Sequence, residues 1–228
     1  MSAGVVLAAG LEARGVADTG HALAAPGREL VAAVRRAADA HPGPVVVVPL
    51  GFGREPSLVA DSARSLRPLA TEGLPVALAG CFGDTGHLVA HLRSAVRRGP
   101  GTDAVLVTSP SIDPFADAGL FRIARLVGQF GAVPLVEVAF TSGARPDVDE
   151  GRERCRLLGH PDPLVVEATM GVLGAAATRV VVDRRVHEAL HRLDHGDDGL
   201  DSGAAAEDGH GYAHSHVMAD GSVVTHSH

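Results

Sequence analysis

Unbroken runs of apolar residues recur along this chain, and each run is followed by a segment with helical spacing. Pro44 to Leu50 is one such run, and Ala104 to Thr108 is another. A strand that lacks alternating polar residues is typical of a parallel sheet covered on both faces. Parallel neighbours need long crossovers, which the helical segments between the strands supply. The pattern therefore predicts an α/β fold.

The strand–helix order occurs twice, so we predict two similar halves whose parallel sheets face a cleft. The expected halves are residues 1–100 and 101–193, joined near Gly99. A helix capped by Asp113 is expected to turn Phe115, Ile123, Val127 and Phe130 inward. The expected strands are 4–10, 44–50, 74–79, 104–108, 134–140 and 163–169, and the expected helices 27–40, 56–69, 86–98, 113–130, 146–158 and 183–193.

The charge of the chain is concentrated at its end. All 20 basic residues are Arg, and from Asp194 onward there are seven acidic residues and no Arg, so this tail carries the whole net charge of -7. No basic patch indicates a nucleic-acid partner. Gly, Asp, Ser, Ala and His dominate the tail, and such a composition cannot bury enough apolar area to fold. We therefore expect residues 194–228 to be disordered without a ligand.

Cysteine usage and hydropathy point to the cytoplasm. Cys81 and Cys155 are isolated and form no CxxC pair or disulfide framework, as expected in a reducing compartment. No basic segment precedes the apolar run from Ala3 to Gly10, and no run approaches the ~18 apolar residues of a membrane span. We expect a soluble cytoplasmic protein without a membrane partner, and its oligomeric state stays open.

Eight of the 13 histidines lie in the last 42 residues. His187, His191 and His195 are spaced i, i+4, i+8 and share one helix face, where two imidazoles can chelate a divalent ion. The alternative is a solvated helix end, where histidine suits the C-terminal dipole. The spacing leaves both interpretations open.

The tail adds five histidines, in an arrangement that includes two His-Ser-His triplets. Such tracts bind late first-row metals such as Co, Ni, Cu and Zn, which predicts metal storage or delivery. A purification tag is the alternative, but interspersed acids and Tyr212 argue against it. We expect deletion after Leu193 to remove most of the metal binding and to leave the fold intact. The five are His210, His214, His216, His226 and His228.

Several segments resemble the CbiX-type sirohydrochlorin chelatases (class II chelatases), which insert cobalt or another divalent metal into a tetrapyrrole. The resemblance implies chelatase-like, Rossmann-like halves and a role in cobalamin or sirohaem biosynthesis. It also implies a tetrapyrrole such as sirohydrochlorin as substrate, with Co, Ni, Fe or Zn as substrate or ligand and no organic cofactor. The segments are Val136 to Phe140 with Ala144 to Cys155, Ala104 to Asp113, Met170 to Leu173, and Val45 to Leu50.

The resemblance also indicates candidate site residues. Ala9 stands where the family has its first metal histidine, and Glu55 is the one possible ligand near the second. Glu55 would then be the catalytic proton acceptor and metal ligand, at a cleft that the turn at Ala8–Gly10 also faces. His87 matches a histidine that begins the last helix of the family's first half, whereas His91 has no counterpart.

Three functions remain open from the sequence. The first is a working chelatase that uses Glu55 and His87 and receives metal from the tail. The second is a non-catalytic relative that stores or delivers metal through its His-rich tail. The third is an α/β protein whose tail only buffers metal.

Overall fold

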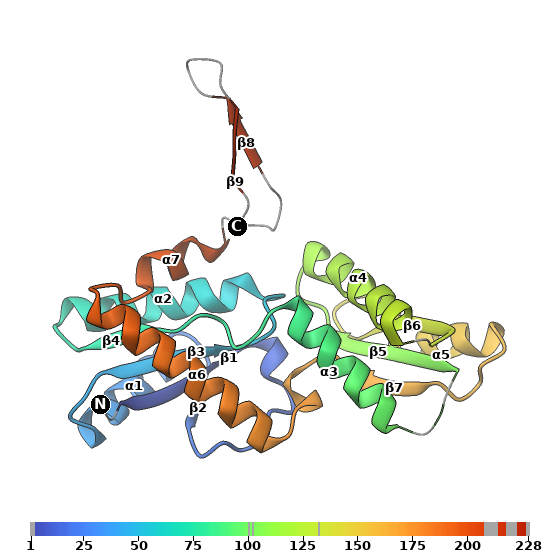
Figure 1. Cartoon of the computed structure of the whole chain (residues 1–228), viewed down its shortest axis with the longest axis horizontal. Coiled ribbons are helices and arrows are strands. Elements are labelled where there is room, and N and C mark those ends of the chain that lie inside the picture. Colours follow the sequence, from blue (N-terminus) through green and yellow to red (C-terminus); the bar gives the residue numbers. More distant parts are fainter. Residues whose placement is uncertain are drawn as a thin grey trace.

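The computed structural model of the chain describes residues 3–99, 101, 103–131, 133–207, 214–217 and 223–226. Over these residues the chain forms seven α-helices and two parallel sheets, one of four strands and one of three, plus a short antiparallel pair (Figure 1). The prediction of an α/β fold with parallel sheets is confirmed.

The first sheet has the strand order β2-β1-β3-β4, and all its pairs are parallel. Every residue of β3 is buried, as its continuous apolar sequence predicted. Alternate residues pack on opposite faces, with Val45 and Val47 towards α1 and α2, and Val46 and Val48 towards α6. The elements are β1 (Gly4–Ala9), η1 (Leu11–Ala13), β2 (Ala22–Ala24), α1 (Arg28–Ala40), β3 (Val45–Leu50), α2 (Pro56–Thr71), β4 (Val76–Leu78) and α3 (Thr85–Arg98).

The second sheet has the order β6-β5-β7 and is also parallel throughout. The central strand β5 is buried along its whole length, because residues of α3 and α4 pack over one face of the sheet and α5 covers the other. A side chain at Gly151 of α5 would come within 2.8 Å of Ala139, so this helix lies close against the sheet. The elements are β5 (Ala104–Pro110), α4 (Pro114–Gly131), β6 (Leu135–Ser142), α5 (Val148–Leu157), β7 (Leu164–Glu167), η2 (Met170–Val172) and α6 (Ala175–Asp194).

Two of the four residues expected to face inward from α4 do so. Ile123 and Val127 are buried, whereas Phe115 is 57% exposed and Phe130 56% exposed. The prediction was wrong for the two phenylalanines because they lie in the first and last turns of α4, beyond the part that packs on the sheet. Phe130 instead lies under the guanidinium of Arg93, 5.7 Å from its ring centre.

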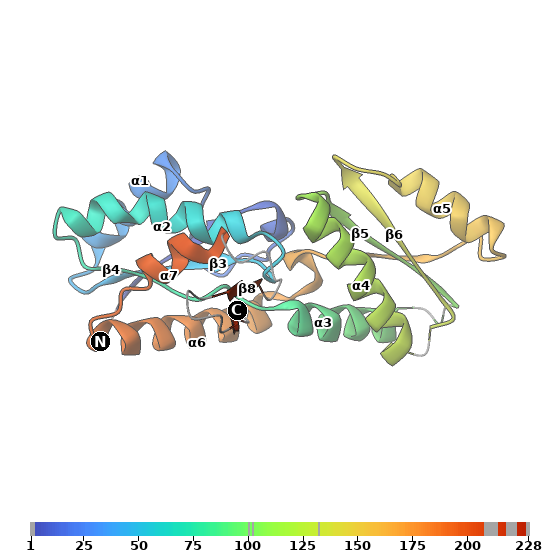
Figure 2. The same ribbon diagram turned by 90° about the horizontal axis from the view of Figure 1, so that it is seen from above.

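The two sheets exchange their final helices. α3 follows the last strand of the first sheet but contacts α4 and β7, and α6 follows the last strand of the second sheet but contacts β3 and β4. Figure 2 shows α3 and α6 along the same side of the molecule, with α1 and α5 on the opposite side. One hydrophobic core consequently runs through both halves, from Val46 and Phe52 to Val105 and Phe140.

The segment after α6 folds back on the first half. α7 (Leu200–Ala204) and η3 (Ala205–Glu207) contact α2, and Leu200 is only 4% exposed. Gly203 lies so close to Leu78 that a side chain there would collide with it. The prediction that the chain is disordered from residue 194 was therefore wrong for residues 195–207, because one apolar residue flanked by glycines packs tightly on α2 and β4.

Two short strands follow in the chain. β8 (His214–Val217) and β9 (Val223–His226) pair antiparallel. Among the described residues, no helix combines the length and the apolar character that crossing a membrane would need.

Candidate functional site

The loops that follow β1 and β3 emerge side by side. These strands are parallel neighbours, with Ala9 opposite Leu50, so both chains leave the sheet at the same edge. The first loop forms η1, and the second runs through Gly53 to Glu55, which occupies the N-cap position of α2 without a capping bond from its side chain. Loops after the carboxyl ends of parallel strands are where α/β proteins place their ligand sites.

Two glutamates bind each other's loop. The Oε2 atom of Glu55 accepts hydrogen bonds from the backbone N–H groups of Leu11 at 2.7 Å and Glu12 at 3.4 Å. In return, Oε2 of Glu12 accepts from the N–H groups of Phe52 at 2.8 Å and Arg54 at 3.1 Å. The two loops are thus tied together by four bonds between carboxylate and backbone.

Glycine at two positions makes this close approach possible. A Cβ atom at Gly10 would collide with the carboxylate of Glu55, and one at Gly51 would lie 2.7 Å from Oε2 of Glu12. Gly10 therefore lies directly against the Glu55 carboxylate.

Burial changes the acid–base properties of both carboxyls. Glu12 is 1% exposed, and its burial raises the pKa of that carboxyl, although Arg54 and two backbone N–H groups oppose the rise. Burial likewise raises the pKa of the half-buried Glu55, against the N–H groups of Glu12 and Leu11. A carboxylate with a raised pKa is a better proton acceptor near neutral pH than an exposed one.

Arg54 connects the two halves. It is 5% exposed, and its Nη1 donates to the Oγ atom of Ser109 on β5 at 2.8 Å. The same Nη1 lies 3.9 Å from Oε1 of Glu12, an ion pair rather than a hydrogen bond. Burial lowers the pKa of the Arg54 guanidinium, but an arginine stays charged at any physiological pH. Sequence reasoning missed the site roles of Glu12 and Arg54, because neither belongs to a motif with recognisable spacing.

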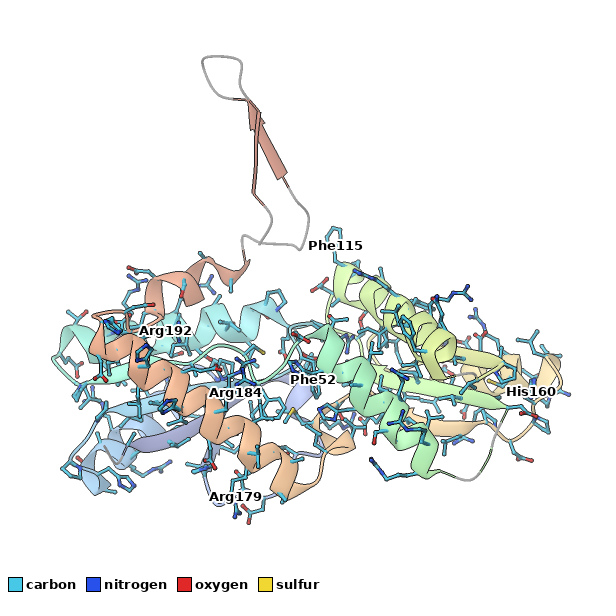
Figure 3. All side chains as sticks on the ribbon, viewed as in Figure 1. Phe52, Phe115, His160, Arg179, Arg184 and Arg192 are labelled. Carbon is cyan, nitrogen blue, oxygen red and sulfur yellow. The ribbon has the colours of Figure 1, made fainter. Side chains whose placement is uncertain are left out.

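A cavity of about 220 Å³ lies next to this cluster. Its wall is formed by Gly53 and Arg54 from the first half, Thr85 at the start of α3, and Gly119 and Arg122 of α4. In Figure 3, Phe52 marks the loop after β3, near the start of α3 and beside the second half, and Phe115 marks the start of α4. The cavity therefore has walls from both halves.

His87 serves as a helix cap. Asp84 Oδ1 accepts from the backbone N–H of His87 at 2.9 Å, and the N–H of Asp84 donates to Nδ1 of His87 at 3.3 Å, a reciprocal capping box at the start of α3. The bond from the His87 N–H lowers the pKa of Asp84. In the part of the chain that the structure describes, no three His, Cys, Asp or Glu side chains converge as a metal site would require.

The histidines of α6 are exposed and lie away from these loops. The rings of His191 and His195 are 4.8 Å apart between centres, so the i, i+4 spacing does bring two imidazoles together, and His187 lies one turn earlier. Figure 3 shows the Arg192 end of this helix far from Phe52. His214, His216 and His226 belong to β8 and β9, and His210 and His228 lie outside the described residues.

The chain matches no protein-family model and no curated protein. What the site can do chemically is therefore argued from its own groups. It combines a carboxyl of raised pKa at a loop edge, a buried guanidinium and an adjoining cavity. Such a site can accept a proton and hold an anionic group at the same time.

Proposed function

We propose that this chain is a chelatase of the sirohydrochlorin type, with two Rossmann-like halves around the cleft. It would insert Co²⁺, Ni²⁺ or Fe²⁺ into a tetrapyrrole such as sirohydrochlorin, in cobalamin or sirohaem biosynthesis. The observation that carries the proposal is the position of Glu55. Its carboxylate joins the loops after β1 and β3, the two places where the resembled family keeps its metal-binding histidines, and burial raises its pKa.

Metal insertion needs a group that accepts protons beside the incoming ion. A tetrapyrrole loses two pyrrole N–H protons when it binds a divalent ion, and each proton must move to a base. In Glu55, Oε2 is held by backbone N–H groups, while Oε1 has no hydrogen bond among the described residues. Glu55 would take one pyrrole proton on Oε1 and the second would pass to solvent water, with the substrate's own nitrogens supplying most of the metal ligands.

The direct test is metal insertion into sirohydrochlorin, followed by absorbance. We expect the protein to exceed the spontaneous rate with at least one of Co²⁺, Ni²⁺ and Fe²⁺. Glu55→Gln keeps an oxygen that can accept the two loop N–H groups but removes the proton acceptor. It should slow insertion by about 100-fold or more, the usual contribution of a general base. Glu153→Gln is the matched control, because Glu153 pairs only with Arg156 on the surface of α5.

A gain of function provides a second arm of this test. Ala9→His would place an imidazole at the end of β1, in the segment that leads into the loop held by Glu55, and should raise the insertion rate by adding a metal ligand. A wild-type protein that inserts none of the three metals above background would overturn the proposal.

A second candidate function is metal storage or delivery by the tail, and the register of β8 and β9 favours it. His214 lies opposite His226, and His216 is two positions along the same strand. The register thus brings three histidine positions together in one short strand pair, and histidine is a ligand suited to Co, Ni or Zn.

Calorimetry with Ni²⁺ on the full chain and on a chain that ends at residue 207 separates the two candidates. Loss of binding in the shorter chain, together with unchanged metal insertion, would assign holding of the ion to the tail and chemistry to the cleft. Unchanged stoichiometry in the shorter chain would exclude the tail as the binding site.

A further inference from the structure

Arg54 carries two buried hydrogen-bond donors without an acceptor. Its Nη1 is bonded to Ser109, whereas its Nε and Nη2 are buried and have no hydrogen-bond partner among the described residues. These two nitrogens form one edge of the guanidinium, the edge that binds both oxygens of a carboxylate at once. Burying a charged group whose donors have no acceptor costs free energy, so an acceptor bound at this edge would be stabilising.

The four acidic residues around Arg54 do not fill this edge. Four negative charges near Arg54 oppose the lowering of its pKa, but none of these carboxylates forms a hydrogen bond with the guanidinium. They belong to Glu12, Glu55, Asp113 and Asp117. Asp113 Oδ1 accepts from the N–H groups of Phe115 and Ala116 at 2.7 and 2.9 Å.

Asp117 is occupied in the same way. Its two oxygens accept from the Ser111 hydroxyl at 2.6 Å and the Ile112 N–H at 3.1 Å. Glu12 and Glu55 each hold two backbone N–H groups of the neighbouring loop. No described carboxylate therefore hydrogen-bonds to Nε or Nη2 of Arg54. Oε1 of Glu12 also lacks a partner and lies 3.9 Å from Nη1, so an acceptor for the Nε and Nη2 edge can be supplied by a ligand.

A glycine keeps the adjoining cavity open. Gly119 lies inside α4 on the cavity wall, where glycine costs about 0.5–1 kcal/mol relative to alanine. An ideal Cβ at this position would meet nothing within 4 Å. Gly151 in α5 differs, because there a Cβ would press on Ala139 and Leu106. Packing explains Gly151, whereas nothing in the packing requires a glycine at position 119.

We propose that this cavity, with Arg54, Thr85, Gly119 and Arg122 on its wall, binds a carboxylate of an organic substrate. The inference rests on the proposed function and names the part of the substrate that is recognised, an acetate or propionate side chain of the tetrapyrrole. A monoanion is favoured over a phosphate because four acidic residues surround Arg54 and would repel a dianion. Since the free edge of Arg54 is shielded from solvent, the side chain must turn towards the cavity that it already lines.

The test measures binding of metal-free sirohydrochlorin, so that no turnover is needed. Arg54→Gln should weaken binding about 10- to 100-fold, the usual loss for a bidentate charge-assisted pair. Arg54→Lys should restore it only partly, because an ammonium group cannot form the paired bonds. With the methyl ester of sirohydrochlorin, wild type and Arg54→Gln should bind equally, a result that a merely structural role of Arg54 would not produce.

A second variant tests the cavity without changing Arg54. Gly119→Leu fills the space and should weaken binding of the free acid, while Gly119→Ala, which leaves most of the volume, should not. Both substitutions favour the helix, so a loss of binding would not come from unfolding. Equal binding of the free acid by wild type, Arg54→Gln and Gly119→Leu would overturn the inference.

Failure of the proposed function has a different signature. If the wild type binds no sirohydrochlorin, propionate is titrated and the ¹⁵N resonance of the Arg54 Nε–H is followed. A shift that is lost in Gly119→Leu would sustain a carboxylate site while removing the tetrapyrrole as its ligand. The absence of any shift in the wild type would overturn both the proposed function and the carboxylate site.

Discussion

The loops after β1 and β3 and the end of α6 place reactive side chains in opposite ways. In these loops, Glu12, Arg54 and Glu55 are buried or half-buried, and each is held by hydrogen bonds to another loop or, for Arg54, to strand β5. On α6, His191 and His195 are exposed and touch mainly through their own helical spacing.

The difference shows how each kind of site arises. Helical spacing alone can bring two imidazoles together, so the α6 pair is visible in the sequence. The carboxylates of Glu12 and Glu55 each reach the other's loop because two parallel strands end side by side, and burial then raises the pKa of both groups. Four experiments, from the largest expected effect to the smallest, test whether this contrast holds.

Removing the buried carboxylate of Glu12 should cause the largest loss in the free energy of unfolding. Glu12→Ala leaves two buried N–H groups without an acceptor and Arg54 without its ion-pair partner, so we expect a loss of about 3–5 kcal/mol in the free energy of unfolding. Glu188→Ala on α6 is the matched control. It removes exposed ion pairs with Arg184 and Arg185 and should cost less than about 1 kcal/mol. Equal losses in urea unfolding would erase the distinction between the two regions.

Shortening the chain should separate the packed part of the C-terminal segment from the rest. Deletion after Leu193 removes α7 and exposes the surface that Leu200 covers, which should cost about 1.5–3 kcal/mol. Deletion after residue 207 keeps α7 and should leave the melting temperature close to that of the full chain. Identical melting temperatures for both truncations would show that α7 adds no stability.

The raised pKa of Glu55 should make the free energy of unfolding depend on pH. Burial raises the pKa of Glu55 above its ordinary value of 4.5, so its contribution is fully present below pH 4.5 and is lost as pH rises through the folded pKa. The free energy of unfolding should therefore fall as the pH rises above 4.5, with a slope of at most about 1.4 kcal/mol per pH unit for each such group. Glu55→Gln should flatten this slope, while the exposed control Glu153→Gln leaves it unchanged. A slope that survives Glu55→Gln would assign it to Glu12 instead.

The α6 pair should give the smallest effect. In a chain that ends at residue 207, Ni²⁺ should bind weakly through His191 and His195, whose rings lie 4.8 Å apart. His195→Ala should abolish this binding, whereas His187→Ala should reduce it less, because the ring of His187 is one turn further away. Calorimetric titration with Ni²⁺ at pH 7.5 would measure the affinity of each variant. Equal losses of affinity in both variants would indicate a site of three histidines.

Much of the fold could be predicted from local pattern. The continuous apolar runs of β3 and β5 identified strands covered on both faces, and both are buried throughout. The start of α6 was missed by eight residues, since Ala175 to Val182 carries no cap or break that marks a helix there. α7 was missed because its composition resembles that of a disordered tail, and only the surface of α2 and β4 gives Leu200 a place to pack.

The candidate site, like the fold, was predicted from the sequence only in part. The sequence determined the α/β class, the parallel sheets and the pairing of His191 with His195, because each depends on residues that are near one another in the chain. Glu55 became a candidate through the resemblance to the chelatases and not through local pattern. The tertiary structure alone decided that α3 and α6 change places, that Glu12 and Glu55 hold each other's loops, and that Arg54 reaches Ser109. Those contacts join residues about 40 or more positions apart, and their strength comes from burial, which no local pattern records.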